Sequence, residues 1–347
     1  MVVLVYLDWP ERCFRANEDD LRYLRSLLPR GAKVVSVRSD RAFLAALPQA
    51  THVITWHFKP EWYRLAPKLA LVATPAAGRE LVAPPPSPLT PNPSPLTPHP
   101  SPLTPNPSPL TPNPSPLRLH YGGFHGAIIS ETVLAFVLAY AHGFFATKPL
   151  WPRSLRAADV IDVAGTTAVI AGYGRIGKAI AARLSAFGVS VRGLTHAECD
   201  RLKGKVGGRG ASFSALRSSL KLADWFILAL PSDTGTDDFL DAELLSALSK
   251  KCVVINVGRG NAIDERALLS ALRRGRIAAA YLDVFRHEPT VLAKGRTKLT
   301  AAERASDLAS LSAAKLPRNL IRTPHGSAFS PSYVKAAFKE LKDEKLI

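Results

Sequence analysis

The 347-residue sequence is 47% hydrophobic, an ordinary value for a globular protein, and its length predicts two domains with a core each. Its formal net charge of +17 could attract nucleic acid or anionic lipid, but the Lys and Arg residues are spread out without a basic arm, so we expect neither a nucleic-acid partner nor a membrane partner. The three cysteines have neither CxxC nor CxxH spacing, which argues against a disulfide scaffold and a metal site and favours a reducing cytoplasm.

Strand-like and helical patterns alternate over residues 1–75. Apolar runs predict strands at 2–7, 33–37, 51–56 and 69–74, and apolar residues at helical spacing predict helices at 19–28 and 42–47. This alternation is typical of a parallel sheet covered by helices. Because no glycine fingerprint occurs here, we expect this domain not to hold a dinucleotide. The first ten residues lack a basic segment and include Asp8, so they do not resemble a signal peptide.

Small residues follow the fourth predicted strand. Ala77 and Gly78 lie at its carboxyl end, where ligands bind in open α/β sheets. Their backbone N–H groups could donate to a substrate carboxylate. A plain loop explains the same residues equally well.

A proline-rich repeat comes next. Four heptapeptides of the type SPLTPNP occupy residues 87–114, and no Asp, Glu, Lys or Arg lies between Glu80 and Arg118. Such a segment can form neither a helix nor a central strand and lacks the apolar residues for a core. We therefore expect residues 84–116 to be a disordered, partly polyproline II insert in a surface loop. A lid over the substrate and a PxxP ligand are the alternatives.

The longest apolar stretch spans residues 127–145 and includes Glu131 and His142. It is about long enough to cross a bilayer, but the charge near one end favours a buried helix.

A dinucleotide fingerprint follows this helix. A strand predicted at 168–171 ends in Gly172-Tyr173-Gly174-Arg175-Ile176-Gly177, and a helix at 178–184 and a strand at 189–194 come next. In a strand–turn–helix context of this kind, the first glycine permits the tight turn, the second lets the backbone approach a pyrophosphate, and the third lets the helix pack on the strand. The sequence therefore predicts that these six residues bind a dinucleotide phosphate at the helix N-terminus.

Four more strands are predicted, at 225–230, 252–257, 277–282 and 320–323, with helices at 243–248 and 266–272 between them. A polar cluster follows each strand, on the side of the sheet where ligands bind.

Three ordered motifs after the fingerprint carry a resemblance. INVGRGNAIDERALLSAL, AAAYLDVFRHEP and NLIRTPHGSAF are similar to segments of the D-isomer-specific 2-hydroxyacid dehydrogenases. The resemblance implies an α/β fold with a Rossmann-type doubly wound nucleotide domain inserted in a flavodoxin-like substrate domain. We assign residues 1–123 to the substrate domain, 124–323 to the nucleotide domain and 324–347 to a return into the substrate domain. It also implies a homodimer formed through the nucleotide domain.

The resemblance assigns roles to single residues. Arg259 would hold the substrate carboxylate and polarise its carbonyl, and His325 would exchange a proton with the carbonyl oxygen during hydride transfer. Glu288 would hold the His325 imidazolium, and Asp283 would lie near the nicotinamide. The other expected cofactor contacts, which lie at strand ends, are Thr195, His196, Leu230, Pro231, Thr236, Val257 and Gly258.

The sequence departs from the family pattern in two places. Thr195 stands where NAD-preferring members carry an acidic residue against the adenosine ribose, so we expect NAD or NADP as cofactor, and His196 or Arg201 could favour NADP. The segment between Glu288 and His325 is also longer than usual, with a helix predicted at 301–314.

The leading interpretation is thus an enzyme that reduces a small 2-oxo acid of the glyoxylate or hydroxypyruvate type, or oxidises the (R)-2-hydroxy acid. A non-catalytic protein of the same fold that senses a dinucleotide is the alternative, and a protein inactivated by its insert is a third. The presence of Arg259, Glu288 and His325 together favours catalysis.

Overall fold

The computed structural model describes residues 1–78, 81–85, 117–145, 160–202, 218–232, 235–287 and 316–347. These residues form two compact units. The first unit comprises residues 1–123 and 331–347, and the second comprises residues 124–330. The boundary between the units thus follows Ser330, whereas the sequence suggests Thr323. The proline-rich segment 86–116 and the helix predicted at 301–314 lie outside the described residues.

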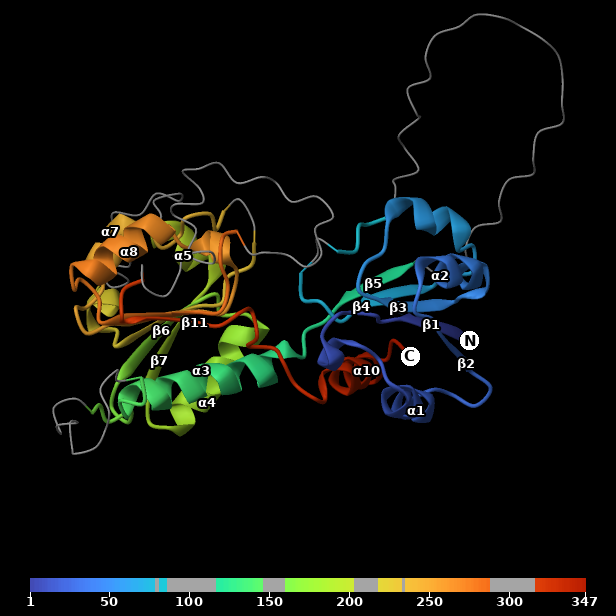
Figure 1. The fold of residues 1–347 in the computed structure, drawn as a ribbon, viewed down its shortest axis with the longest axis horizontal. Coiled ribbons are helices and arrows are strands. Elements are labelled where there is room, and N and C mark those ends of the chain that lie inside the picture. The colour runs from blue at the N-terminus through green and yellow to red at the C-terminus, as the bar shows by residue number, and fades with distance from the viewer. Residues whose placement is uncertain (79–80, 86–116, 146–159, 203–217, 233–234, 288–315) are drawn as a thin grey trace, which may run out of the picture. The chain divides into compact units, whose positions relative to one another are not determined.

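The first unit is built on a five-stranded parallel sheet (Figure 1). The sheet order is β2-β1-β3-β4-β5, which is the flavodoxin order. Its strands are β1 (Val2–Tyr6), β2 (Lys33–Ser36), β3 (His52–Thr55), β4 (Leu71–Thr74) and β5 (Arg118–Tyr121). Its helices are α1 (Glu18–Leu27), α2 (Asp40–Ala46) and α10 (Tyr333–Asp343), with short 3₁₀ turns at Arg12–Phe14, Leu47–Gln49 and Pro60–Leu65.

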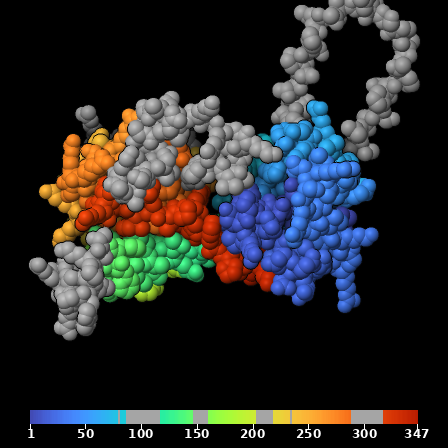
Figure 2. Space-filling view, viewed as in Figure 1, coloured from blue at the N-terminus to red at the C-terminus, as the bar shows by residue number. Residues whose placement is uncertain are grey.

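Both faces of this sheet are covered. Phe43 of α2 and Trp62 pack with Leu4 and Val53 on one face. On the other face α10 packs against α1 and the Arg12–Phe14 turn. In the space-filling view, the red surface of the C-terminal residues meets the blue surface of the N-terminal residues there (Figure 2). The last helix therefore completes the core of the first unit.

The second unit contains a six-stranded parallel sheet of order β11-β10-β9-β8-β6-β7. The strands are β6 (Thr167–Ala171), β7 (Ser190–Leu194), β8 (Trp225–Leu228), β9 (Val253–Asn256), β10 (Ala279–Leu282) and β11 (Leu320–Arg322). The helices are α3 (His125–Ala141), α4 (Arg175–Ala186), α5 (His196–Leu202), α7 (Ala242–Ala247) and α8 (Glu265–Arg273), with a 3₁₀ turn at Gly260–Ala262. Helices α3 and α4 cover one face, and α5, α7 and α8 cover the other (Figure 1).

Burial on both faces explains the continuous apolar strands of the second unit. All residues of β8, β9 and β10 are buried, which is typical of a parallel sheet between two helical layers. The chain runs from β6 to β7 on one side and returns to β8 on the other. This reversal creates a topological switch point at the carboxyl ends of β6 and β8, where doubly wound sheets bind their ligands.

The apolar stretch predicted as a buried helix is α3. It spans 17 residues, and Val133 and Val137 are fully buried in the core against the sheet. Among the described residues, no helix is long and apolar enough to cross a membrane.

Candidate functional site

The glycine turn after β6 has the geometry that the fingerprint predicts. Gly172 has φ +94°, and a Cβ atom there would lie 2.6 Å from the Ala229 carbonyl oxygen. A Cβ on Gly177 would lie 2.2 Å from the Gly172 carbonyl oxygen. Only glycine therefore fits at these two positions, because the turn lies close against the end of β8 and α4 packs directly on the turn.

The N-terminus of α4 is open at this turn. Gly174 caps the helix, and the Lys178 N–H donates to its carbonyl oxygen over 2.9 Å. Tyr173, Gly174 and Arg175 are exposed, and no atom crowds the place of a Gly174 Cβ. The first turn of the 12-residue helix thus offers backbone N–H groups and the positive end of the helix dipole, as a pyrophosphate needs.

The end of β7 lies directly against the turn. Gly172 N–H and Tyr173 N–H donate to the Leu194 carbonyl oxygen over 3.3 and 3.2 Å. Thr195 follows and is exposed, and its N–H and its hydroxyl both donate to Glu198 Oε2, over 2.8 and 2.9 Å. The Thr195 N–H bond is the main cause that lowers the pKa of Glu198. The exposed His196 pairs with Asp200 at 3.4 Å.

The loop after β8 contains three of the expected cofactor contacts. Leu230 is buried and Pro231 is exposed. The buried Thr236 donates through its hydroxyl to the Pro231 carbonyl oxygen over 2.8 Å. This hydrogen bond joins two described positions of the loop beside the switch point.

Asn256, the last residue of β9, fixes the loop that carries Arg259. It is fully buried, donates through Nδ2 to the Arg259 carbonyl oxygen over 3.0 Å, and accepts from the Gly258 N–H over 3.1 Å. Val257 and Gly258, two expected cofactor contacts, are buried within this loop. Asn256 was not predicted from the sequence, because an amide inside an apolar strand reveals no role until the loop that it holds is known.

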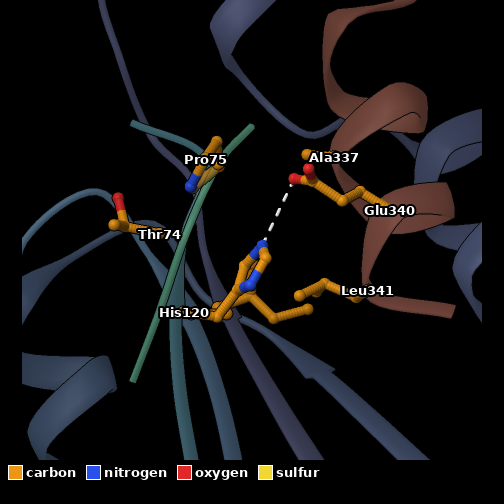
Figure 3. Close-up of a pocket in the computed structure, with 9 residues that line it drawn as sticks. Thr74, Pro75, His120, Ala337, Glu340 and Leu341 are labelled. Atoms are coloured by element: carbon orange, nitrogen blue, oxygen red, sulfur yellow. Dashed lines mark hydrogen bonds and ion pairs between the residues drawn. The ribbon is translucent and has the colours of Figure 1, made fainter. Parts of the chain in front are cut away.

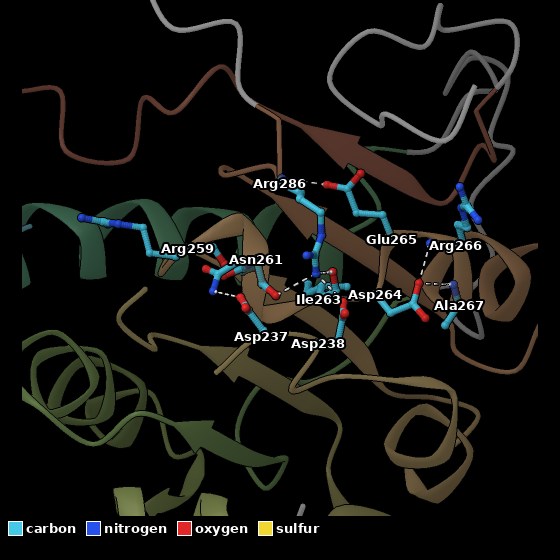
Figure 4. A network of polar contacts seen from close by, with 11 residues as sticks. Asp237, Asp238, Arg259, Asn261, Ile263, Asp264, Glu265, Arg266, Ala267 and Arg286 are labelled. Atoms are coloured by element: carbon cyan, nitrogen blue, oxygen red, sulfur yellow. Dashed lines mark hydrogen bonds and ion pairs between the residues drawn. The ribbon is translucent and has the colours of Figure 1, made fainter. Parts of the chain in front are cut away.

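Arg259 is partly buried, and its Nη1 donates to the Gly258 carbonyl oxygen over 3.0 Å. Its side chain extends away from the polar network behind it (Figure 4). In that network Arg286 Nη2 contacts the Asp238 carboxylate and the Asn261 carbonyl oxygen, and the Arg286 N–H donates to Glu265 over 2.9 Å. The network fastens the 3₁₀ turn after Arg259 to the loop after β10.

Asp283 organises the loop that carries His325. Its Oδ1 accepts from Thr323 Oγ1 over 2.6 Å and from Gly326 N–H over 2.8 Å, and its Oδ2 accepts from Ser327 N–H over 2.9 Å. The His325 N–H donates to the Asp283 carbonyl oxygen over 2.9 Å. His325 itself is exposed and has φ +53°, a conformation that few non-glycine residues adopt.

The structure thus brings Arg259, Asp283 and His325 to the carboxyl ends of neighbouring strands, since β9 pairs with β10 and β10 with β11. Glu288, the expected partner of His325, lies outside the described residues. Ala77 and Gly78 belong to the first unit, after β4.

The first unit contains a small hollow beside β4 and β5. It measures about 10 Å³, about the size of one water molecule, and is lined by Thr74, His120 and Glu340 among others. His120 Nε2 lies 3.2 Å from Glu340 (Figure 3). Its Nδ1 lies 3.3 Å from Glu344. Both Glu340 oxygens also accept from the Gly123 N–H, over 3.0 and 2.9 Å. This cluster of side chains holds α10 against the sheet. The hollow beside it is too small to bind a substrate.

Within the part of the chain that the structure describes, no three His, Cys, Asp or Glu side chains are arranged to bind a metal ion. The glycine turn, the N-terminus of α4 and the described residues of the loops after β8 and β9 fit a dinucleotide.

Comparison with known proteins agrees with this geometry. Residues 141–326 match the family described as D-isomer specific 2-hydroxyacid dehydrogenase, NAD binding domain. A glyoxylate reductase of Thermococcus kodakarensis is 35% identical over 128 residues, which are 37% of this chain and 38% of that protein. A glyoxylate/hydroxypyruvate reductase B of Salmonella paratyphi B is 35% identical over 168 residues, which are 46% and 51% of the two chains. The chain thus spans between about a third and a half of the length of these relatives.

Solved structures share the fold over the whole chain. The NAD complex of a D-isomer specific 2-hydroxyacid dehydrogenase from Lactobacillus delbrueckii ssp. bulgaricus has a TM-score of 0.67 at 17% identity, covering 100% of this chain and 96% of that one. An NADPH-dependent glyoxylate/hydroxypyruvate reductase from Sinorhizobium meliloti has a TM-score of 0.63 at 20% identity, covering 99% and 94%. The predicted fold class is therefore confirmed. Because its matched NAD binding domain makes up more than half of the 347 residues, the chain belongs to the D-isomer specific 2-hydroxyacid dehydrogenase family.

Proposed function

We propose that this protein transfers a hydride between a nicotinamide dinucleotide and a small 2-oxo acid or (R)-2-hydroxy acid. The observation that carries the proposal is the arrangement of Arg259 after β9 and His325 after β11, the two strands that flank β10, with Asp283 at the end of β10 holding the His325 loop. The names of the relatives, glyoxylate reductase and glyoxylate/hydroxypyruvate reductase, support a substrate of this size.

Each residue has a role that its chemistry supports. The Arg259 guanidinium offers a planar fork of donors for the substrate carboxylate and a positive charge near the carbonyl oxygen. The bound dinucleotide supplies or accepts the hydride at the carbonyl carbon. The His325 imidazolium gives its proton to the carbonyl oxygen during reduction, and the neutral imidazole takes the hydroxyl proton during oxidation. Glu288 favours the imidazolium form, and Ala77 and Gly78 add backbone donors for the carboxylate.

The six fingerprint residues and the loops after β7, β8 and β9 hold the dinucleotide. At position 195 no carboxylate opposes a 2′-phosphate, so residue 195 by itself admits NAD or NADP. We further propose a homodimer in the cytoplasm. None of the three cysteines forms a disulfide, which is compatible with a reducing compartment.

The test is the loss of NADH or NADPH absorbance with glyoxylate, hydroxypyruvate, pyruvate and phenylpyruvate. We expect turnover with at least one of these acids, and we expect His325→Ala to lower kcat by roughly 10²–10⁴-fold while dinucleotide binding persists. Dinucleotide binding without turnover on any of the four acids would favour the non-catalytic sensing protein. Near-normal turnover in the variant would remove His325 from the mechanism.

A further inference from the structure

A carboxylate lies at the end of β7, although residue 195 itself is not acidic. It belongs to Glu198. Glu198 Oε2 lies 2.8 Å from Thr195 N and 2.9 Å from Thr195 Oγ1. The Glu198 carboxylate thus lies beside the residue that is acidic in NAD-preferring members of the family. The Thr195 side chain carries no charge, but the negative charge of Glu198 lies within hydrogen-bond distance of it.

This carboxylate also borders the dinucleotide fingerprint. Leu194, the residue before Thr195, accepts hydrogen bonds from the first two residues of the glycine turn. Cys199, the residue after Glu198, is buried, which raises the pKa of its thiol, and the nearby Gly172 backbone opposes this shift. The first turn of α5 is thus in direct contact with the phosphate turn, in the place where doubly wound folds contact the adenosine ribose.

Glu198 is held rigidly and is ionised. About a quarter of its side chain is exposed, and Arg192 lies 3.7 Å from its Oε1. The Thr195 N–H bond, the Thr195 hydroxyl, Arg192 and Arg201 all lower the pKa of Glu198, against a smaller opposing effect of burial. A carboxylate has about four acceptor sites, so Glu198 can accept from a ribose hydroxyl while it keeps these contacts.

Among the described residues, the basic side chains around Glu198 already interact with carboxylates. Arg192 is paired with Glu198, and His196 is paired with Asp200 at 3.4 Å. The positive charge of Arg201 also lowers the pKa of Glu198. A 2′-phosphate bound here would therefore be repelled by the Glu198 carboxylate. It would gain little attraction from Arg192 and His196, because carboxylates already pair with both side chains.

We infer that Glu198 decides the choice of cofactor: its carboxylate accepts the ribose 2′-hydroxyl and repels a 2′-phosphate, so that the protein prefers NAD(H) to NADP(H). The inference rests on the proposed dinucleotide-dependent function. It revises the expectation drawn from Thr195 alone, because the acidic group comes from three residues further along the chain.

The test measures the dissociation constants of NADH and NADPH by nucleotide fluorescence on the full chain, with the native protein, Glu198→Gln and Glu131→Gln. Gln keeps an oxygen that can accept from Thr195, so the start of α5 is preserved while the charge is lost. Glu131→Gln removes the same charge from an exposed side chain of α3 that pairs with Arg183 at 3.1 Å.

We expect the native protein to bind NADH at least about tenfold more tightly than NADPH. In Glu198→Gln this ratio should fall by at least about tenfold, mainly through tighter NADPH binding, which is the order of effect of one charge repulsion at a partly exposed site. Glu131→Gln should keep the native ratio within about twofold, since its exposed charge pairs with Arg183, eight residues along α4 from the glycine turn.

Two results would overturn the inference while leaving the proposed function intact. One is equal or tighter binding of NADPH by the native protein, and the other is a ratio that Glu198→Gln leaves unchanged. If Glu198→Gln weakens NADPH, the cations Arg192, His196 and Arg201 form a phosphate site after all. Failure of the native protein to bind either dinucleotide would refute both the inference and the proposed function.

Discussion

Asp283 should act on catalysis through the His325 loop, and Asp283→Asn isolates that effect. The carboxylate accepts three hydrogen bonds, from the Thr323 hydroxyl and from the Gly326 and Ser327 N–H groups. An asparagine has one oxygen and one NH₂ group. In either orientation its NH₂ group faces one of the two backbone N–H donors, so one donor loses its acceptor.

The expected loss of stability follows from the one backbone donor that loses its acceptor. A buried donor left without an acceptor costs about 1–3 kcal/mol of unfolding free energy. In a unit of this size each kcal/mol lowers Tm by about 2–4 °C. The larger effect should be on turnover, because His325 is held at φ +53° by this loop. A displacement of about 1 Å at a reacting group can lower the rate by about 10²-fold, and we expect kcat/KM to fall by that order.

The assay is a double-mutant cycle on kcat/KM with Asp283→Asn, His325→Ala and the double variant. If Asp283 works through His325, Asp283→Asn should cost about 10²-fold in the native background and less than about threefold in the His325→Ala background. Thr323→Val is the matched control, because it keeps both backbone donors on the carboxylate. Additive losses, or a loss confined to the dissociation constant of the dinucleotide, would show that Asp283 does not act through His325.

Three further predictions test other parts of the molecule. Arg259→Lys should lower kcat and raise KM together, because an ammonium group cannot replace the planar fork; unchanged kinetics would show that Arg259 does not meet the substrate. Glu340→Gln should lower the unfolding free energy by about 1–3 kcal/mol, measured in urea, since Gly123 and His120 lose a charged acceptor in a largely buried cluster; an unchanged midpoint would refute this. Deletion of residues 87–114 should leave Tm and kcat/KM nearly unchanged because loop closure depends weakly on length; a large loss of kcat/KM at constant Tm would identify a lid instead.

Most of the fold follows from the alternation of apolar runs, because strands buried on both faces are continuous apolar segments. Strand β5 escaped prediction because Arg118 is exposed and lies at the sheet edge, so the strand has no apolar run. Helix α10 could have been found. Its buried residues recur at helical spacing, but they follow the last motif, and residues 324–347 were assigned only to a return into the substrate domain. They are Tyr333, Val334, Ala337, Phe338 and Leu341.

The candidate site was predictable where it depends on strand ends. The fingerprint turn and the positions of Arg259, Asp283 and His325 after successive strands follow from the order of motifs, and the family assignment is confirmed. The role of Asp283 in holding the His325 loop was not predictable, because it depends on backbone donors 43 and 44 residues away. Glu198 could have been predicted from the sequence as the acidic residue of a Thr-x-x-Glu capping box, which brings its carboxylate to residue 195.

The discontinuity of the first unit has a consequence for protein synthesis. Residues 124–330 form a contiguous unit, whereas residues 1–123 need α10, the source of Tyr333, Phe338 and Leu341, to cover one face of their sheet. Domains usually fold as units while the ribosome is still adding residues, the N-terminal one first. Here the N-terminal unit cannot be completed first, because it needs α10, which is synthesised after every residue of the second unit. A ribosome that stalls before residue 333 therefore holds a chain whose first unit lacks the helix that covers one face of its sheet.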